Sequence, residues 1–417
     1  MITPRLEINL DKIFHNASTL VRRLKARGIS ITGVTKACMG EPRVAKTLLA
    51  AGVRTLGDSR IENIARMRRA GITAPIALIR SPMLSQTDQI VELADSSHNT
   101  ELDVISALSL SAGAAGRRHA VVLMVELGDL REGILAKDLE AVARRTLKFP
   151  HIDFCGIGAN LACLNGVAPN EENMRELSSM ADQLDRTFRS ATGWIPQVVS
   201  GGNSSNLNWA LNGRGIHRIN NLRLGESILM GIDPLQQTQI DGLYTDAVTL
   251  FAEVIESKRK PRAPRGQLQQ SPFQLGSKLP HKCPVDQAIL AIGHQDVDTD
   301  GLTAPSWVKV IGATSDHLVV SANSQPVAVG SEMAFGLDYS GLVRAMTSPY
   351  VTKLFRGRQN ANHFESRVPA TSRYKDAHNA VWHSQTTLSS AQKRSSDVGN
   401  KFESEKYKTR LGDINIA

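Results

Sequence analysis

The sequence predicts the α/β fold class, as a (β/α)8 barrel of the TIM type with a second, C-terminal β domain and a low-order tail. Through the first 225 residues, short segments rich in Val, Ile and Leu alternate with longer segments of helical spacing. Eight strands can be counted, near residues 31, 54, 75, 97, 120, 152, 197 and 220. This number and order of strands is typical of such a barrel. Because periodicity alone does not show closure, a doubly wound open sheet is the alternative.

The helical segments each carry one apolar face and end at a glycine. In the first segment, apolar residues follow one another at intervals of 4, 3 and 4, at Ile13, Ala17, Leu20 and Leu24. That spacing indicates a buried helical face, and Gly28 just past it is typical of a helix end. Residues 119–128 and 152–160 are instead continuous apolar runs, which suit strands buried on both faces.

The pattern changes near residue 240, where short apolar segments joined by turns replace the long helices. We therefore assign residues 1–240 to the barrel and residues 241–351 to the β domain. Within the latter, residues 257–285 are basic, rich in Pro and Gly and poor in core residues, which predicts a long mobile loop. Residues 352–417 are rich in Ser, Asn, Gln and charged residues, which predicts a basic tail outside both cores.

The net charge of +9 lies mostly in that tail, which has 12 Lys and Arg against 6 Asp and Glu. With 5% aromatic residues and no nucleic-acid motif, a solvated tail explains the charge better than a nucleic-acid surface does. The four cysteines show no CxxC spacing, which favours free thiols over a zinc site or disulfides. No signal-peptide pattern and no long apolar run is found. We expect a cytoplasmic protein with no metal, membrane or nucleic-acid partner.

Barrel enzymes bind their substrates at the carboxyl ends of the strands. Lys36 ends the first strand, directly after ITGVT. Apolar surroundings favour the neutral, nucleophilic form of an amine, although a lysine at a strand end can equally be a surface residue. The seventh strand ends in SGGNSSN, where small residues and the Ser204 and Ser205 hydroxyls could bind an anion. The alternative is a flexible turn that caps the next helix.

Two arginines and a glycine complete this pattern. Arg223 and Gly225 follow the eighth strand, and Arg131 follows the fifth. The loops after strands seven and eight are the recurrent phosphate site of such barrels. Each arginine alone could form a surface salt bridge. Together, a lysine at a strand end, a phosphate-binding pair of loops and two arginines indicate a cofactor that carries an aldehyde and a phosphate.

Segments along most of the chain resemble one family. In the barrel these are VTKACMGEP, VELGDLREGI, GIGANLAC, SGGNSSNL and LRLGESILMG, and in the β domain VIESKRKP, IGHQDVD, GATSDHLVV and LDYSGLVRAMTSPYV. The chain resembles the alanine racemase-like enzymes that use pyridoxal 5'-phosphate (PLP), and is most similar to the ornithine racemase-type amino-acid racemases. The resemblance covers about residues 1–351.

The resemblance implies how PLP is held. Lys36 matches the lysine that bonds covalently to the cofactor. Asn203 and Ser204 match the phosphate loop, and Gly225 matches the backbone donor after the eighth strand. Tyr350 matches a late tyrosine that reaches the phosphate.

Further positions are carried over from the same resemblance. Arg223 matches the arginine that faces the pyridine nitrogen, and Arg131 matches one that holds substrate and cofactor. Asn160 and Ser200 join the cofactor-binding set. The chain also departs from the family, because Gly40 stands where alanine racemases have a tyrosine and Ser200 stands where they have a histidine.

The implied reaction is racemisation by proton transfer at Cα. Lys36 takes the proton from one face, and a second acid returns one from the other. Asp316 and His317 are the candidates, because the matching segment of alanine racemases faces the site of a partner subunit. Asp296 is a further option, and capping of a β-turn is the alternative role for Asp316 and His317. A site shared in this way implies a homodimer.

The resemblance favours a small basic amino acid such as ornithine as substrate. Asp129 or Glu132 could meet its distal ammonium, although either could equally be a solvated loop charge. Three alternatives stay open, namely an alanine racemase, a PLP-dependent decarboxylase on the same fold, and a PLP-binding protein without catalytic activity. Non-catalytic PLP-binding proteins resemble only the barrel part of this chain. The predicted β domain therefore counts against that alternative.

Overall fold

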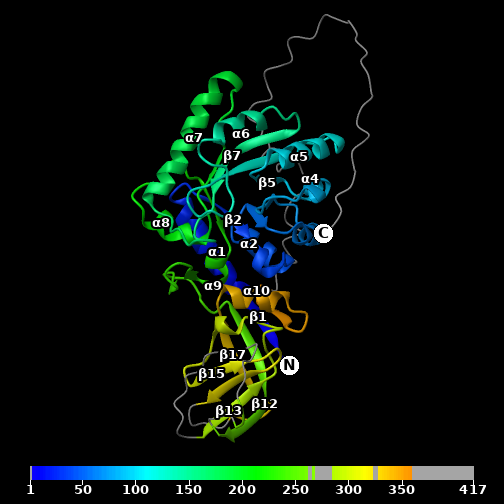
Figure 1. Cartoon of the computed structure of the whole chain (residues 1–417), viewed down its shortest axis with the longest axis vertical. Coiled ribbons are helices and arrows are strands. Elements are labelled where there is room, and N and C mark those ends of the chain that lie inside the picture. The colour runs from blue at the N-terminus through cyan, green and yellow to red at the C-terminus, as the bar shows by residue number, and fades with distance from the viewer. Residues whose placement is uncertain (1, 262–264, 268–283, 323–326, 359–417) are drawn as a thin grey trace, which may run out of the picture. The chain divides into compact units, whose positions relative to one another are not determined.

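A computed structural model describes residues 2–261, 265–267, 284–322 and 327–358 (Figure 1). Eight parallel strands form a closed barrel. They are β2 (Ser30–Val34), β3 (Thr55–Asp58), β4 (Ile76–Leu78), β5 (Ser96–Asn99), β6 (His119–Val125), β7 (Ile152–Ala159), β8 (Val198–Ser200) and β9 (Asn221–Leu224). The eight predicted strands and the barrel are thereby confirmed. Pairing of β2 with β9 closes the barrel and excludes the open sheet.

Helices follow the strands around the barrel. They are α1 (Leu10–Lys25), α2 (Pro42–Ala50), α3 (Ile61–Arg69), α4 (Thr87–Leu93), α5 (Leu102–Ala114), α6 (Leu139–Thr146), α7 (Glu171–Thr192), α8 (Leu207–Asn212) and α9 (Glu226–Met230). The predicted face of α1 is confirmed, because its four apolar residues are all fully buried. Asn9 caps this helix by accepting the backbone N–H groups of Asp11 and Lys12. Among the described residues, no helix is long and apolar enough to cross a membrane.

A second, mostly antiparallel sheet forms the β domain. Its strands are β1 (Arg5–Asn9), β12 (Val248–Lys260), β13 (Val285–Leu290), β14 (Leu302–Thr303), β15 (Val308–Ala313), β16 (Leu318–Ala322), β17 (Glu332–Leu337) and β18 (Thr352–Arg356). Helix α10 (Tyr339–Thr347) follows β17 and packs against the 3-10 turn η1 (Lys36–Cys38). The β domain therefore contacts the turn that carries Lys36.

Three segments differ from their predicted places. Residues 5–9 were assigned to the barrel, but β1 pairs with β12 and β18 of the second sheet. Residues 352–356 were assigned to the tail, but they form β18. Residues 257–260 were assigned to a loop, but they extend β12, and most of that loop lies outside the described residues. Local pattern misses these strands because their partners are distant in sequence.

Three of the four cysteines lie among the described residues. Cys38, Cys155 and Cys163 are free thiols, whereas Cys283 lies outside the described residues. Most of the predicted tail, residues 359–417, also lies outside them.

We predict that the position of β18 makes the effect of truncation depend on where the chain is cut. A variant ending at Val351 loses β18 and leaves β1 with an unpaired edge, so its melting temperature should fall by several degrees. A variant ending at Arg358 keeps the strand and serves as the control. Equal melting temperatures for the two variants, measured by circular dichroism, would contradict this role of β18.

Candidate active site

Lys36 lies at the carboxyl end of the first barrel strand, in a turn that is fixed from both sides. Before it, the Thr35 hydroxyl donates to Asp58 Oδ2 at 2.7 Å. Asp58 is buried and also accepts from the side chain of Asn63 at 2.9 Å. Burial raises the pKa of Asp58, and these hydrogen bonds oppose that effect. Asp58 is a positioning residue for the backbone that leads to Lys36.

The segment after Lys36 is held by a buried carboxylate. Glu41 accepts from Arg43 Nε at 2.6 Å and from Arg66, which also donates to the Met39 carbonyl at 3.1 Å. Gly40 has φ +61°, and a Cβ there would lie 2.6 Å from the Asn63 carbonyl oxygen. This close approach leaves no room for a side chain at Gly40.

The Lys36 side chain itself is exposed. The prediction that the Lys36 amine has apolar surroundings was wrong. Lys36 comes just after the buried residues of β2, so its side chain lies outside the packed wall of the barrel. The Tyr339 ring of α10 is the aromatic group beside it, with 6.0 Å between Nζ and the ring centroid. The amine therefore faces the region between the barrel end and α10.

The loops after β8 and β9 form a cradle around the Ser204 hydroxyl. Ser204 is 4% exposed, and its Oγ lies 3.4 Å from the Gly225 nitrogen and 3.2 Å from the Ser227 nitrogen. A Cβ on Gly225 would lie 3.0 Å from Val34 Cβ, so the backbone passes close to the Lys36 strand. Backbone N–H groups and a hydroxyl in this arrangement are suited to a phosphate. The residues present fit the cofactor that the sequence indicates.

Arg223 lies on β9, where its side chain is buried at the centre of a network of polar groups. Its guanidinium donates to Ser200 Oγ at 2.5 Å, to the Ala159 carbonyl at 2.7 Å and to Asn160 Oδ1 at 3.2 Å. The Asn203 amide donates to the same Asn160 oxygen at 3.1 Å. Burial lowers the pKa of Arg223 to about 10, so it stays a cation near neutrality. Ser200, Asn160 and Asn203 thus orient Arg223, while their contact with a cofactor stays a prediction.

The two carboxylates proposed to meet a substrate ammonium are already engaged. Asp129 is 1% exposed and accepts backbone N–H groups of the loop after β7, including those of Cys163 and Leu164. Glu132 pairs with Arg131, and this hydrogen bond raises the pKa of the arginine. Asp129 is therefore a loop anchor, and Glu132 is a partner of the predicted substrate-binding arginine.

The predicted second acids lie in the β domain. Asp316 and His317 form the turn between β15 and β16 and pair with each other at 2.8 Å. The hydrogen bond from His317 lowers the pKa of Asp316. His294 donates its backbone N–H to Thr314 in the same turn, so the segment containing Asp296 lies alongside. These residues are gathered in one place, but no described contact joins them to Lys36 of the same chain.

Two predicted residues have other surroundings than expected. Asp296 is buried and accepts from the Gly293 nitrogen and the Ser348 hydroxyl, which indicates a structural role. Tyr350 is 67% exposed. Its contact with the phosphate stays a prediction, and the tyrosine that lies beside Lys36 is Tyr339. Its signal in the sequence is LDYSG, in which Asp338 caps a helix by accepting the Gly341 N–H at 2.7 Å.

Glu226 and His98 are further site residues that sequence reasoning missed. Glu226 directly follows Gly225 in LRLGES, and burial raises its pKa to about 7. His98 is buried on β5, and its Nδ1 has no hydrogen-bond partner among the described residues. Burial and the charge of Arg223 keep the pKa of His98 low, so a neutral imidazole lies in the barrel near that arginine.

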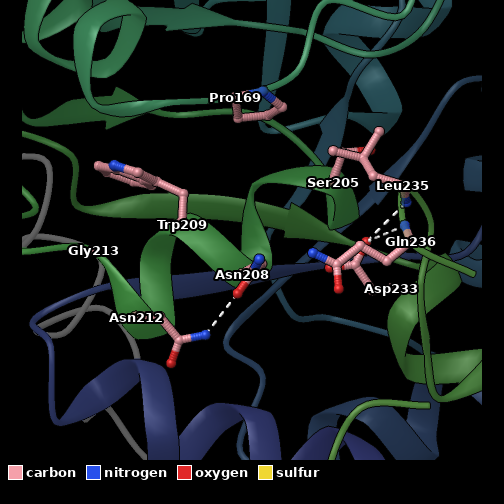
Figure 2. A pocket seen from close by; sticks show the side chains of 9 residues that line it. All are labelled: Pro169, Ser205, Asn208, Trp209, Asn212, Gly213, Asp233, Leu235 and Gln236. Carbon is pink, nitrogen blue, oxygen red and sulfur yellow. Dashed lines mark hydrogen bonds between the residues drawn. The ribbon is translucent and has the colours of Figure 1, made fainter. Parts of the chain in front are cut away.

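A separate hollow of about 330 Å³ lies beside the phosphate cradle (Figure 2). It is lined by Pro169, Ser205, Asn208, Trp209, Asn212, Gly213, Asp233, Leu235 and Gln236. Asn212 donates to Asn208 at 2.6 Å, and Asp233 accepts the N–H groups of its own turn. Because its lining includes Ser205 but neither Lys36 nor Arg223, this hollow is distinct from the candidate active site.

A closed barrel with a lysine, a phosphate cradle and a buried arginine at the carboxyl ends of its strands defines a class of barrel enzymes that fit a phosphorylated aldehyde cofactor. Comparison with known proteins narrows the class. Residues 8–234 match the model of the alanine racemase N-terminal domain, and the chain belongs to this family.

Two relatives match over more than four fifths of this chain. Lysine racemase of Thermotoga maritima is 37% identical over 85% of this chain and 99% of its own length. Ornithine racemase of Acetoanaerobium sticklandii is 33% identical over 84% of this chain and 99% of its own length. The protein is a racemase. Alanine racemase from Streptomyces lavendulae has the same fold, with a TM-score of 0.68, 19% identity and coverage of 87% of this chain and 100% of that one.

We predict that Gly40→Ala destabilises the protein more than a control glycine substitution does. Both Gly40 and Gly71 have a left-handed φ, but a Cβ on Gly71 meets nothing within 4 Å. Gly71→Ala therefore measures the backbone strain alone, and the additional cost at Gly40 should be about 1–3 kcal/mol from the contact with Asn63. Urea unfolding checks this difference, and equal costs would contradict the packing of the Lys36 turn.

Proposed function

We propose that this racemase uses PLP and acts on a basic amino acid, with ornithine or lysine as the natural substrate. The observation that carries the proposal is the position of Lys36, which is held by the Thr35–Asp58 contact next to the Ser204–Gly225 cradle. The names of the two relatives support the substrate class. Their matches extend beyond the barrel, which counts against the alternative of a barrel-only protein without catalytic activity.

Each residue of the candidate site has its own role in the proposed reaction. PLP, when bound, supplies a conjugated ring that spreads negative charge away from the substrate Cα. The cradle of Ser204 and Gly225 would hold the phosphate, and Lys36 would take or give the proton on one face of Cα. Arg223 would face the pyridine nitrogen and, as a cation, would disfavour protonation there. Arg131 and Tyr339 border the substrate, one from a barrel loop and the other from α10.

The second acid comes from another subunit in this proposal. The turn of Asp316 and His317 lies in the β domain, and no contact brings it to Lys36 within the described chain. In a cytoplasmic homodimer, this turn would complete the site of the partner copy, with His317 or Asp316 serving the face of Cα opposite Lys36.

Lys36→Ala should abolish both the visible absorption of bound PLP and racemisation. Lys25→Ala, an exposed lysine on α1, is the control and should retain both. In the wild-type protein, borohydride should bleach the visible band. A wild-type protein that shows no such band after addition of PLP, or a Lys36→Ala variant that keeps full racemase activity, would overturn the proposal.

Sharing of the site between subunits predicts complementation. Lys36→Ala and the double variant Asp316→Asn, His317→Asn should each be inactive, because each removes one of the two proton-transfer groups. After unfolding and refolding together, heterodimers contain one intact site, so activity should return to about a quarter of the wild-type value. Failure to recover activity, with mixed dimers demonstrated by mass, would contradict the shared site.

A further inference from the structure

A basic amino acid needs a negatively charged group at the far end of its side chain. The carboxylates expected from the sequence, Asp129 and Glu132, are engaged by backbone N–H groups and by Arg131. Asp58 and Glu41 hold the Lys36 turn and are likewise engaged. Among the described residues, a further carboxylate beside Lys36 and the cradle is that of Glu226, at the start of α9.

Strand pairing places Glu226 next to Lys36. β2 and β9 are neighbours in the barrel, with Gly33 opposite Leu224. The chain continues to Lys36 on one strand and to Glu226 on the other, and Gly225 packs directly against Val34 between them. The two side chains therefore emerge at the same barrel end from adjacent loops.

The Glu226 carboxylate lacks a binding partner within the described residues. It is half-buried, yet none of those residues gives it a hydrogen bond or an ion pair. Lys36 is near enough to lower its pKa through charge but does not pair with it. A half-buried carboxylate without a partner is costly, so a cationic ligand at this position would be favoured.

The charges around Glu226 also favour a cation. Burial has the largest effect on the pKa of Glu226 and raises it, the charge of Lys36 lowers it, and the carboxylates of Asp338 and Asp233 raise it, with a net pKa of about 7. Burial and then the charge of Glu226 raise the pKa of Tyr339. Asp338 caps α10 and Asp233 caps its own turn, so both are held in place. Glu226 is the member of this group that is free to bind a ligand.

We propose that Glu226 binds the distal ammonium of a basic amino-acid substrate and thereby selects ornithine and lysine over neutral amino acids. This inference rests on the proposed function, in which the substrate Cα lies at the Lys36 amine. A side chain of three or four carbons extends from that point, and the adjacent loop after β9 carries a carboxylate to meet its end.

The test compares substrates that differ in the distal charge. We expect Glu226→Gln to lower the ratio of kcat/KM for lysine to that for norleucine by roughly 100-fold, mainly through the KM for lysine. Glu172→Gln, an exposed carboxylate on α7, is the matched control and should leave the ratio unchanged. Glu132→Gln tests the rival carboxylate. An unchanged ratio in Glu226→Gln, or an equal loss in Glu132→Gln, would overturn the inference.

The ratio should also depend on pH in a defined direction. Only ionised Glu226 attracts the ammonium, so in the wild type the preference for lysine should fall as the pH falls through about 7. Dividing by the value for norleucine removes the titration of the α-amine, which both substrates share. Glu226→Gln should show a flat ratio over this range, and a ratio that still falls with pH would contradict the assignment.

A shorter carboxylate provides a test that does not remove the charge. Glu226→Asp withdraws the carboxylate by one methylene, so the preference should move from ornithine towards the longer lysine. A shift of preference towards ornithine would count against direct contact between the Glu226 carboxylate and the distal ammonium. Failure of the proposed function is distinguishable, because the wild-type protein would then not racemise ornithine or lysine. Failure of this inference leaves racemisation of both, with a preference that does not change in Glu226→Gln.

Discussion

The pairing of β2 with β9 is the constraint on which the candidate site depends. Without closure, Lys36 would lie at one edge of a sheet and the loops after β8 and β9 at the other. The register that places Gly33 opposite Leu224 brings the lysine turn against the phosphate cradle. Gly225 is needed at this junction because a Cβ would press on Val34. Closure of the barrel thus assembles the amine, the hydroxyl and the backbone donors from opposite ends of the barrel sequence.

The buried arginine of this site is unusual in its partners. Arg223 donates to a hydroxyl, a backbone carbonyl and an amide oxygen, and none of these carries a charge. Buried cations are usually paired with carboxylates, since desolvation is costly. Neutral acceptors hold Arg223 in place without neutralising it, so its positive potential remains directed into the barrel end. The neutral His98 imidazole nearby is consistent with that potential.

The sequence predicted the barrel well because parallel strands and amphipathic helices are encoded locally. It also predicted that Lys36, Ser204, Arg223 and Gly225 lie at or just after the carboxyl ends of barrel strands, which is where the structure places them. It failed for features that depend on distant contacts. β1 looks like any short strand until β12 and β18 are present to pair with it. The contact of Tyr339 with Lys36 is also missed, because it joins α10 of the β domain to a turn of the barrel. Likewise, the sequence shows several carboxylates near the site, but it does not show which of them already pair with an arginine or accept backbone N–H groups.

The pairing of β1 has a consequence for how the protein is made. β1 leaves the ribosome before the barrel strands, β12 follows only after the whole barrel sequence, and β18 comes about a hundred residues later still. During that time the apolar side chains of Leu6 and Ile8, fully buried in the finished protein, have no sheet to cover them. These pairings are among the contacts of highest sequence separation in the fold, and such contacts tend to form late. Until β12 and β18 have emerged from the ribosome, the apolar face of β1 stays exposed, and exposed strands of this kind favour aggregation of nascent chains.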